Sequence, residues 1–341
     1  MRIGLVGGGV IGRTHAQTIA ATAGFDLAGI ADPHPGGAGL AREFDTPHHS
    51  DHRSLLAAGP LDAVIVATPN QLHVPIGLDV VAAGVALLVE KPIATTSDEA
   101  RVLIASSDAA GVPVLVGHHR RHHPVIRRAK EIIASGRLGR IVAVSGAAVM
   151  RKSDDYFDVE WHRTRGTGGP FLINLIHEVD LLRHLVGEIT SVAALASSAA
   201  RGLEVEDTGA IAFAFATGAL ASLTISDAVA GPWSWDLSAG DSARFPLHDV
   251  AALRIGGESA SLALPTLELW EHDGPCSWTT PMRAQRQAIL PGDPYVAQLW
   301  HLGDVAAGRA EPLVSAREGA RDLEVVEAEM RSAATGAAVA V

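Results

Sequence analysis

The amino-acid sequence predicts an α/β chain in which a doubly wound parallel sheet is followed by an α+β part with a large, mostly antiparallel open sheet. Short apolar runs that do not alternate recur along the first third and are separated by helical stretches. Such runs are typical of strands buried on both faces. Later runs alternate polar and apolar residues, as in strands with one buried face. The sequence therefore predicts two domains, 1–120 and 121–341.

The first domain is expected to alternate strands and helices. Expected strands cover residues 3–6, 27–31, 63–67, 86–89 and 112–116, and expected helices cover residues 10–23, 73–83 and 97–110. Gly84 and Gly111 follow two of these helices, where a glycine can adopt the left-handed conformation that ends a helix. Strand–helix–strand repetition of this kind predicts parallel strands joined by right-handed crossovers.

The second domain is expected to be built on alternating strands. Expected strands cover residues 191–197, 211–215, 221–226, 251–255, 259–264 and 267–271, and expected helices cover residues 124–134, 295–307 and 316–328. Thr217 and Gly218 form a short connection between two of these strands. Alternation favours antiparallel pairing with one face packed on a core.

Composition and charge exclude several classes of protein. Of the 341 residues, 48% are hydrophobic and 19% are charged, which is typical of a globular chain long enough for two cores. The net charge of −11 argues against a nucleic-acid partner, and the basic run 118–123 is too short to bind one. Cys276 is the only cysteine, so we expect an inert thiol and a reducing compartment. The N-terminal residues lack the pattern of a signal peptide, and no run approaches the ~20 apolar residues of a membrane-spanning helix, which predicts a cytoplasmic protein without a membrane partner.

A glycine-rich turn joins the first expected strand to the first expected helix. In the run GGGVIG, Gly7 permits the tight turn, Gly9 lets the backbone approach a pyrophosphate, and Gly12 allows close helix–strand packing. Val10 and Ile11 open the helix, whose N–H groups and dipole favour phosphate charges. The turn therefore predicts a dinucleotide-binding Rossmann domain.

The end of the second expected strand indicates which dinucleotide binds. Asp32 would accept hydrogen bonds from the adenosine ribose hydroxyls and would repel a 2′-phosphate. Pro33 and His34 follow it and supply no arginine to hold such a phosphate. NAD is therefore the expected cofactor. NADP stays open, because His34 can carry a charge near neutral pH.

Further segments combine with this site into a known pattern. They are ATPNQLH at 67–73, EKP at 90–92 and GGPFLINLIHE at 168–178, with PY at 294–295 and EPLV at 311–314. Together they resemble the glucose–fructose oxidoreductase, inositol dehydrogenase and rhizopine-catabolism (Gfo/Idh/MocA) family of NAD(P)-dependent sugar and polyol oxidoreductases. The resemblance covers almost the whole chain.

The resemblance implies that Lys91 is the catalytic lysine, at the end of a parallel strand beside the nicotinamide, with Glu90 in the same motif. A partly desolvated lysine near a nicotinamide cation would lose its proton more readily and could transfer protons. The loop after the strand at 63–67 is implied to line the cofactor through Thr68, Asn70, Leu72 and His73. His73 could instead simply begin the next helix.

The third motif is implied to carry the remaining catalytic groups. Asn174 and His177 lie three residues apart on a helix that Pro170 is suited to start, so both side chains should share one face. Family members usually have an aspartate four residues before the histidine, where this chain has Ile173. The departure shifts the expected proton acceptor toward Lys91 or makes His177 a weaker base. Asn174 can still hold substrate, since an amide donates and accepts hydrogen bonds.

Other expected substrate contacts are spread along the chain. By resemblance, His119 and Arg120 face the substrate, whereas Arg121, His122 and His123 depart from the family pattern. Trp161 and Arg163 are expected to form one wall of the pocket. Trp233 and Trp235 could stack on a sugar ring or could pack within the sheet.

These observations lead to one functional hypothesis and two alternatives. The hypothesis is NAD(P)-dependent oxidation of a secondary alcohol of a sugar, polyol or related cyclic substrate, with Lys91 accepting the proton and His177 assisting. One alternative is an NAD-dependent glycosidase-type enzyme that oxidises its substrate transiently, and the other is a non-catalytic NAD-binding regulator that senses metabolites. No metal motif occurs. An open sheet face predicts a homodimer or homotetramer.

Overall fold

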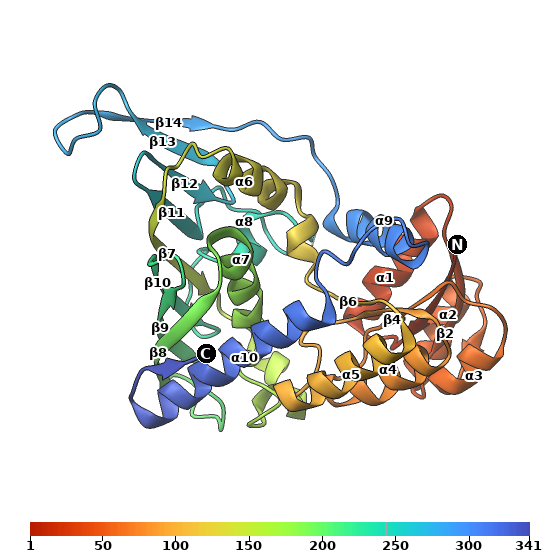
Figure 1. Ribbon diagram of the computed structural model, residues 1–341. Helices are drawn as coiled ribbons and strands as arrows, with labels where there is room; N and C mark the ends of the chain where they lie inside the picture. Colours follow the sequence, from red (N-terminus) through yellow and green to blue (C-terminus); the bar gives the residue numbers. More distant parts are fainter. Residues whose placement is uncertain (243) are drawn as a thin grey trace. The chain divides into compact units, whose positions relative to one another are not determined.

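The computed structural model describes residues 1–242 and 244–341, which form two compact units (Figure 1). The first unit comprises Met1–His119 and Asp293–Leu323, and the second comprises Arg120–Gly292 and Glu324–Val341. The passage from the first unit to the second lies between His119 and Arg120. The sequence predicted a second domain that runs without interruption from residue 121 to residue 341. In the structure, the segment Asp293–Leu323 packs with the first unit instead.

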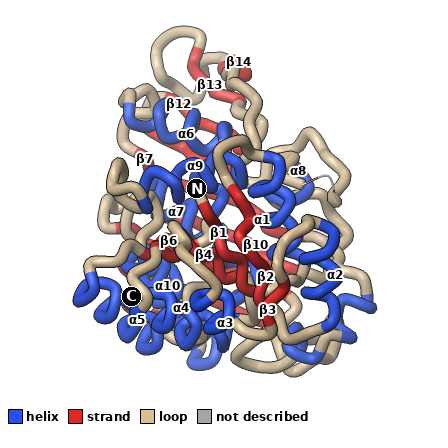
Figure 2. Tube along the Cα trace, turned by 90° about the vertical axis from the view of Figure 1, so that its right-hand side faces the viewer, coloured by secondary structure: helices blue, strands red, loops and turns tan. Residues whose placement is uncertain are grey.

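A six-stranded parallel sheet forms the centre of the first unit. The strands are β1 (Arg2–Val6), β2 (Asp26–Ala31), β3 (His48–His49), β4 (Ala63–Val66), β5 (Ala86–Val89) and β6 (Val114–Val116). The helices are α1 (Val10–Ala21), α2 (Pro35–Glu43), α3 (His52–Ala57), α4 (His73–Ala82), α5 (Ser97–Ala110), α9 (Pro294–Ala306) and the first part of α10 (Ala316–Thr335). The strand order β3-β2-β1-β4-β5-β6 confirms the doubly wound sheet, and Figure 2 shows β2 beside β1.

Helices cover both faces of the parallel sheet. On one face Ile19 of α1, Leu40 of α2 and Leu302 of α9 pack with Leu5 and Leu88 of the strands. The helices α3, α4 and α5 lie side by side on the opposite face (Figure 1). Burial of the apolar side of α9 in this core is the physical reason that the segment from Asp293 belongs to the first unit.

Three elements of the first unit were not expected from the sequence, namely α2, β3 and α3. The helix α2 contains Gly36, Gly37 and Gly39, and glycine disfavours a helix. The strand β3 has two residues, and α3 has six residues that begin after an Asp51 cap. Elements this short carry no periodic signal, so tertiary packing decides them.

A nine-stranded sheet forms the centre of the second unit. The strands are β7 (Ile141–Val149), β8 (Ile189–Ser197), β9 (Thr208–Phe215), β10 (Leu220–Ser226), β11 (Leu253–Gly257), β12 (Ala260–Leu264), β13 (Glu268–His272), β14 (Met282–Arg286) and β15 (Val339–Ala340). The helices are α6 (Pro124–Ala134), α7 (Ile176–Val186), α8 (Trp235–Ser238) and the last part of α10. Short 3-10 turns cover Asp154–Asp158 and Glu160–Arg163.

The nine-stranded sheet is mostly antiparallel, as expected. Its order is β14-β13-β12-β11-β7-β10-β9-β8-β15, and only β7 and β10 pair in parallel. The central strand β7 was missed, because its sequence IVAVSGAAV mixes small and polar residues and shows little β-branched alternation. Along β9 and β10, buried and exposed residues alternate.

A π-helical turn, Phe171–Leu175, precedes α7 in the expected 168–178 motif. Phe171 is buried, and its ring lies over Gly209 of β9. A Cβ atom added at Gly209 would lie only 2.1 Å from Cε1 of that ring. Because Gly209 has no side chain, the ring of Phe171 can pack at this point and anchor the turn to the sheet.

In the part of the chain that the structure describes, no helix is both long and apolar enough to cross a membrane. Cys276 is exposed in the turn between β13 and β14.

The contact between Phe171 and Gly209 predicts a stability effect. Gly209→Ala should lower the free energy of unfolding by about 1–3 kcal/mol, because the added methyl group overpacks the core. Gly36→Ala is the control, since nothing lies within 4 Å of its added Cβ and alanine favours the helix α2. Urea unfolding followed by circular dichroism measures both. Equal stability of the two variants would contradict the packing argument.

Candidate functional site

The glycine turn has the geometry that the sequence predicts. Gly7 has φ +101°, and a Cβ there would lie 2.3 Å from the Ala67 carbonyl oxygen. A Cβ at Gly12 would lie 2.0 Å from the carbonyl oxygen of Gly7. Gly9 caps α1 and has nothing within 4 Å of an added Cβ. The first N–H groups of α1 therefore face an open side, as an approaching pyrophosphate needs.

Asp32 connects this turn to the next helix. Its Oδ2 accepts a hydrogen bond from Gly8 N at 2.6 Å, and its Oδ1 accepts one from His34 N at 2.8 Å. Each carboxylate oxygen keeps a second lone pair for a ribose hydroxyl. Pro33 and His34 are exposed and bring no fixed cation to the end of β2. The arrangement fits the ribose of NAD.

Glu90 lies buried beneath the backbone of Lys91. Its Oε1 accepts from His15 Nε2 at 2.9 Å, and its Oε2 accepts from Lys91 N at 3.2 Å. Burial by itself would raise the pKa of Glu90. The hydrogen bond from His15 and the positive charges of His15, His119 and Lys91 act in the opposite direction and leave the pKa below its ordinary value. Glu90 is therefore an ionised carboxylate that supports the end of β5.

His73 is buried between the loop after β4 and the segment that follows Lys91. Its side chain is fully buried, with Nδ1 2.7 Å from the Pro92 carbonyl oxygen and Nε2 2.9 Å from the Thr68 carbonyl oxygen. Burial lowers the pKa of His73, so the neutral ring donates one of these two bonds at a time. His73 also begins α4. It ties the loop after β4 to the segment that follows Lys91.

Asn70 and Leu72 form a 3-10 turn in this loop, and neither is buried. Their exposure is compatible with the expected contact to a cofactor.

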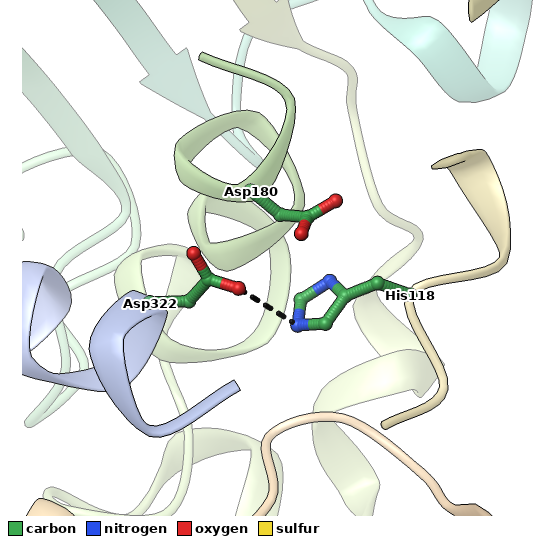
Figure 3. Close-up of side chains that lie close together, drawn as sticks. All are labelled: His118, Asp180 and Asp322. Atoms are coloured by element: carbon green, nitrogen blue, oxygen red, sulfur yellow. Dashed lines mark ion pairs between the residues drawn. The ribbon is translucent and has the colours of Figure 1, made fainter. Parts of the chain in front are cut away.

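The basic run 118–123 is divided among several partners. His118 is buried, with Nε2 3.5 Å from Oδ2 of Asp322 (Figure 3). The ring of His119 stacks on Tyr295 at 4.5 Å, and Tyr295 meets the edge of His15 at 5.7 Å. Tyr295, which the resemblance placed only in a motif, thereby joins the surroundings of Glu90.

Arg120 is buried in the second unit. Its Nη1 lies 2.6 Å from Oε1 of Glu178 and its Nη2 3.0 Å from Oδ1 of Asp236. Burial disfavours the charged form of the guanidinium, but the negative charges of Asp236 and Glu178 outweigh this effect and raise the pKa of Arg120. Arg121 pairs in the same way with Asp180, at 2.7 Å. These pairs connect Arg120 and Arg121 to the first turns of α7, and the expected contact of Arg120 with substrate stays a prediction.

The two candidate tryptophans of the second unit differ in burial. Trp235 is 2% exposed and donates from Nε1 to Oδ2 of Asp241 at 2.6 Å, and its ring packs edge-on against His123. Trp233 is 48% exposed. Trp235 therefore packs inside the second unit, whereas the exposed Trp233 stays a candidate for contact with substrate. Trp161 is half-buried against the His162 ring, 4.0 Å away, and Arg163 is exposed.

Asn174 lies in the π-helical turn, and His177 is buried in the first turn of α7. The expected shared face assumed a regular α-helix, and a π turn changes the angular spacing of its residues. Asn174 Oδ1 accepts a hydrogen bond from Lys152 Nζ at 2.8 Å.

Lys152 was not expected in the site. Nothing in the sequence singles it out, because the chain has three lysines, Lys91, Lys130 and Lys152, among 27 basic residues and their number does not distinguish them.

Comparison with known proteins identifies the family. Residues 1–118 match the model described as "Oxidoreductase family, NAD-binding Rossmann fold", and residues 126–257 match the GFO/IDH/MocA C-terminal domain. The chain belongs to the GFO/IDH/MocA family of oxidoreductases, and its first unit is an NAD-binding Rossmann domain.

Several similar proteins carry names that refer to sugars or sugar derivatives. Levoglucosan dehydrogenase of Pseudarthrobacter phenanthrenivorans is 30% identical over 58% of this chain, and the match spans about half of that relative (54%). The 1,5-anhydro-D-fructose reductase of Ensifer adhaerens is 27% identical over 100% of this chain and 98% of its own length. The crystal structure of the WlbA dehydrogenase from Bordetella pertussis, with NADH and UDP-GlcNAcA, has a TM-score of 0.81 and 27% identity over 100% of this chain and 98% of that chain.

The position of Asp32 predicts the cofactor preference. The double substitution Asp32→Ser and Pro33→Arg should shift kcat/KM toward NADP, because it removes a repulsive charge and adds a phosphate partner. Asp26→Ser, at the exposed other end of β2, should leave the preference unchanged. Initial rates with both cofactors measure the ratio. A wild-type protein that strongly prefers NADP would show that Asp32 does not select the cofactor.

Proposed function

We propose that this protein is an NAD-dependent dehydrogenase that oxidises a secondary alcohol of a sugar, a polyol or a related cyclic compound. The observation that supports this most directly is the position of Lys91. It follows the carboxyl end of β5, where open α/β sheets bind ligands, and the ionised Glu90 supports its backbone. The names of the relatives support a sugar-like substrate.

The site residues of the first unit have separate tasks in this proposal. NAD+, when held by the glycine turn and Asp32, would supply the hydride acceptor for the substrate carbon. Lys91 Nζ takes the hydroxyl proton. Glu90 and His15 hold the Lys91 backbone, and His73 holds the segment that follows it. Asp32 and the glycine turn bind the adenosine half of the cofactor.

The second unit is proposed to bind the substrate. His177 and Asn174 supply polar contacts, and Trp161, Arg163 and Trp233 are the exposed or half-buried residues available to line the pocket. We also place the protein in the cytoplasm, where the single exposed thiol of Cys276 stays reduced.

Lys91→Met tests the proton-transfer role. Turnover should fall by roughly 10²–10⁴, the usual contribution of a positioned acid–base group. NADH binding, followed by fluorescence, should persist, because Asp32 and the glycine turn hold the cofactor elsewhere. Lys130→Arg is the matched lysine control, since Lys130 donates to the His184 carbonyl oxygen and lies outside this site. Near-normal turnover of Lys91→Met on a substrate that the wild type oxidises would refute the assignment.

The sheet of the second unit is proposed to be the oligomer interface. Its outward positions are small or apolar along adjacent strands, including Ala210 and Ala212 of β9 and Ser222 of β10. Leu195 of β8 is 71% exposed and Leu220 of β10 is 61% exposed. A flat face of this kind suits self-association with a second copy of the chain.

Light scattering at micromolar concentration should therefore give the mass of a dimer or tetramer. Ala212→Arg should reduce that mass, because it places a charge in the centre of the face. Ala109→Arg on the exposed side of α5 is the control and should not change it. A monomeric wild-type protein would exclude this interface.

A further inference from the structure

Lys152 is held rigidly just beyond the end of β7. Its backbone N–H donates to the Asp227 carbonyl oxygen at 2.9 Å, and its own carbonyl oxygen accepts from Arg201 Nη2 at 2.8 Å. Both backbone groups are therefore occupied. The side chain is half-buried and ends beside Asn174, with Nζ 2.8 Å from Oδ1. A fixed stem and a short contact give this ammonium a defined position.

The contact determines which end of the Asn174 amide faces the ammonium. A lysine ammonium only donates hydrogen bonds, so the amide must present its oxygen and not its nitrogen. The orientation of an asparagine amide is otherwise ambiguous, and here the chemistry of the partner settles it. The Nδ2 group is then on the other branch of the side chain. Within residues 1–242 and 244–341 it has no hydrogen-bond acceptor, and Asn174 is half-exposed.

Three titratable groups, Tyr156, Asp227 and His162, surround Lys152. Tyr156 OH is 3.4 Å from Nζ, and burial, followed by the charge of Asp227, raises the pKa of Tyr156 well above its ordinary value, so the phenol stays neutral. Burial raises the pKa of Asp227 against the opposing charges of Lys152 and Arg201, and Asp227 pairs with Arg201 at 3.0 Å. Burial lowers the pKa of His162, whose ring stacks on Tyr156 at 3.8 Å.

We propose that Lys152 is a positioning residue that makes Asn174 a hydrogen-bond donor, so that its Nδ2 group binds an acceptor oxygen of the substrate. The substrate part of this inference rests on the proposed function. It assigns Asn174 a task different from that of an aspartate in the same motif. A carboxylate here would pair with Lys152 and would offer no N–H to the substrate, so Asn174→Asp would not make His177 a stronger base.

Lysine-specific labelling tests the pair without any assay of activity. With Lys91, Lys130 and Lys152 as the only lysines, protein labelled with ¹³C,¹⁵N-lysine gives few side-chain signals, and Lys152→Met identifies one of them by its loss. Asn174→Ala should shift the Lys152 Cε and Nζ signals and leave those of Lys130 in place. An unshifted Lys152 signal would overturn the proposal, because the hydrogen bond would be absent in solution.

Kinetics test the consequence for the substrate. Lys152→Met should raise KM about tenfold with a smaller change in kcat, because a freed amide loses its orientation and ground-state binding weakens. Lys152→Arg should recover part of the loss, since guanidinium also only donates. Asn174→Ala should raise KM about as much, and adding it to Lys152→Met should cost little more. Lys130→Arg is the control.

The outcomes separate this inference from the proposed function. The positioning role would be overturned if the effects of Lys152→Met and Asn174→Ala on KM were additive. It would also be overturned if Lys152→Met lowered kcat and stability but left KM unchanged. A wild-type protein that oxidises none of a panel of sugars and polyols would overturn the proposed function and the substrate contact with it. The labelling experiment would still decide whether Lys152 orients Asn174.

Discussion

The buried carboxylate of Glu90 is the interaction on which the first unit's site depends. A charge taken out of water must be compensated by hydrogen bonds or by opposite charge, and here His15 of α1 and the backbone of Lys91 provide both. The carboxylate also requires Gly117 after β6, where a Cβ would lie 2.8 Å from it. One desolvated group thus joins a helix and the ends of two strands, and it sets where the Lys91 backbone lies.

The second unit uses arginine–carboxylate pairs for the same purpose. Arg120 and Arg121 are buried with Glu178 and Asp180 of α7, so the helix that carries His177 is held by charge as well as by apolar packing. Phe171 anchors the preceding π turn in the space above Gly209. A π turn before a helix places the side chains that follow it differently from a regular α-helix, and such turns are frequent at functional sites.

Most of the first unit could be predicted because its signals are local. The turn at Gly7 and Gly12 needs glycine for steric reasons that depend on a few neighbouring atoms, and the strands are continuous apolar runs. The roles within the basic run 118–123 could not be predicted in this way. Its members look alike in sequence, yet His118 meets Asp322 and His119 stacks on Tyr295, at positions far along the chain.

The sequence by itself determined the Rossmann unit, the mostly antiparallel sheet, the expected cofactor and the motifs that contain Lys91, Asn174 and His177. These follow from periodicity, from steric demands on glycine and from short motifs, all of which operate over a few residues. Only the tertiary structure decided that the segment from Asp293 completes the first unit and that Lys152 faces the oxygen of Asn174. Both depend on contacts between residues distant in sequence, which no local pattern encodes, because burial and pairing are set by the whole fold.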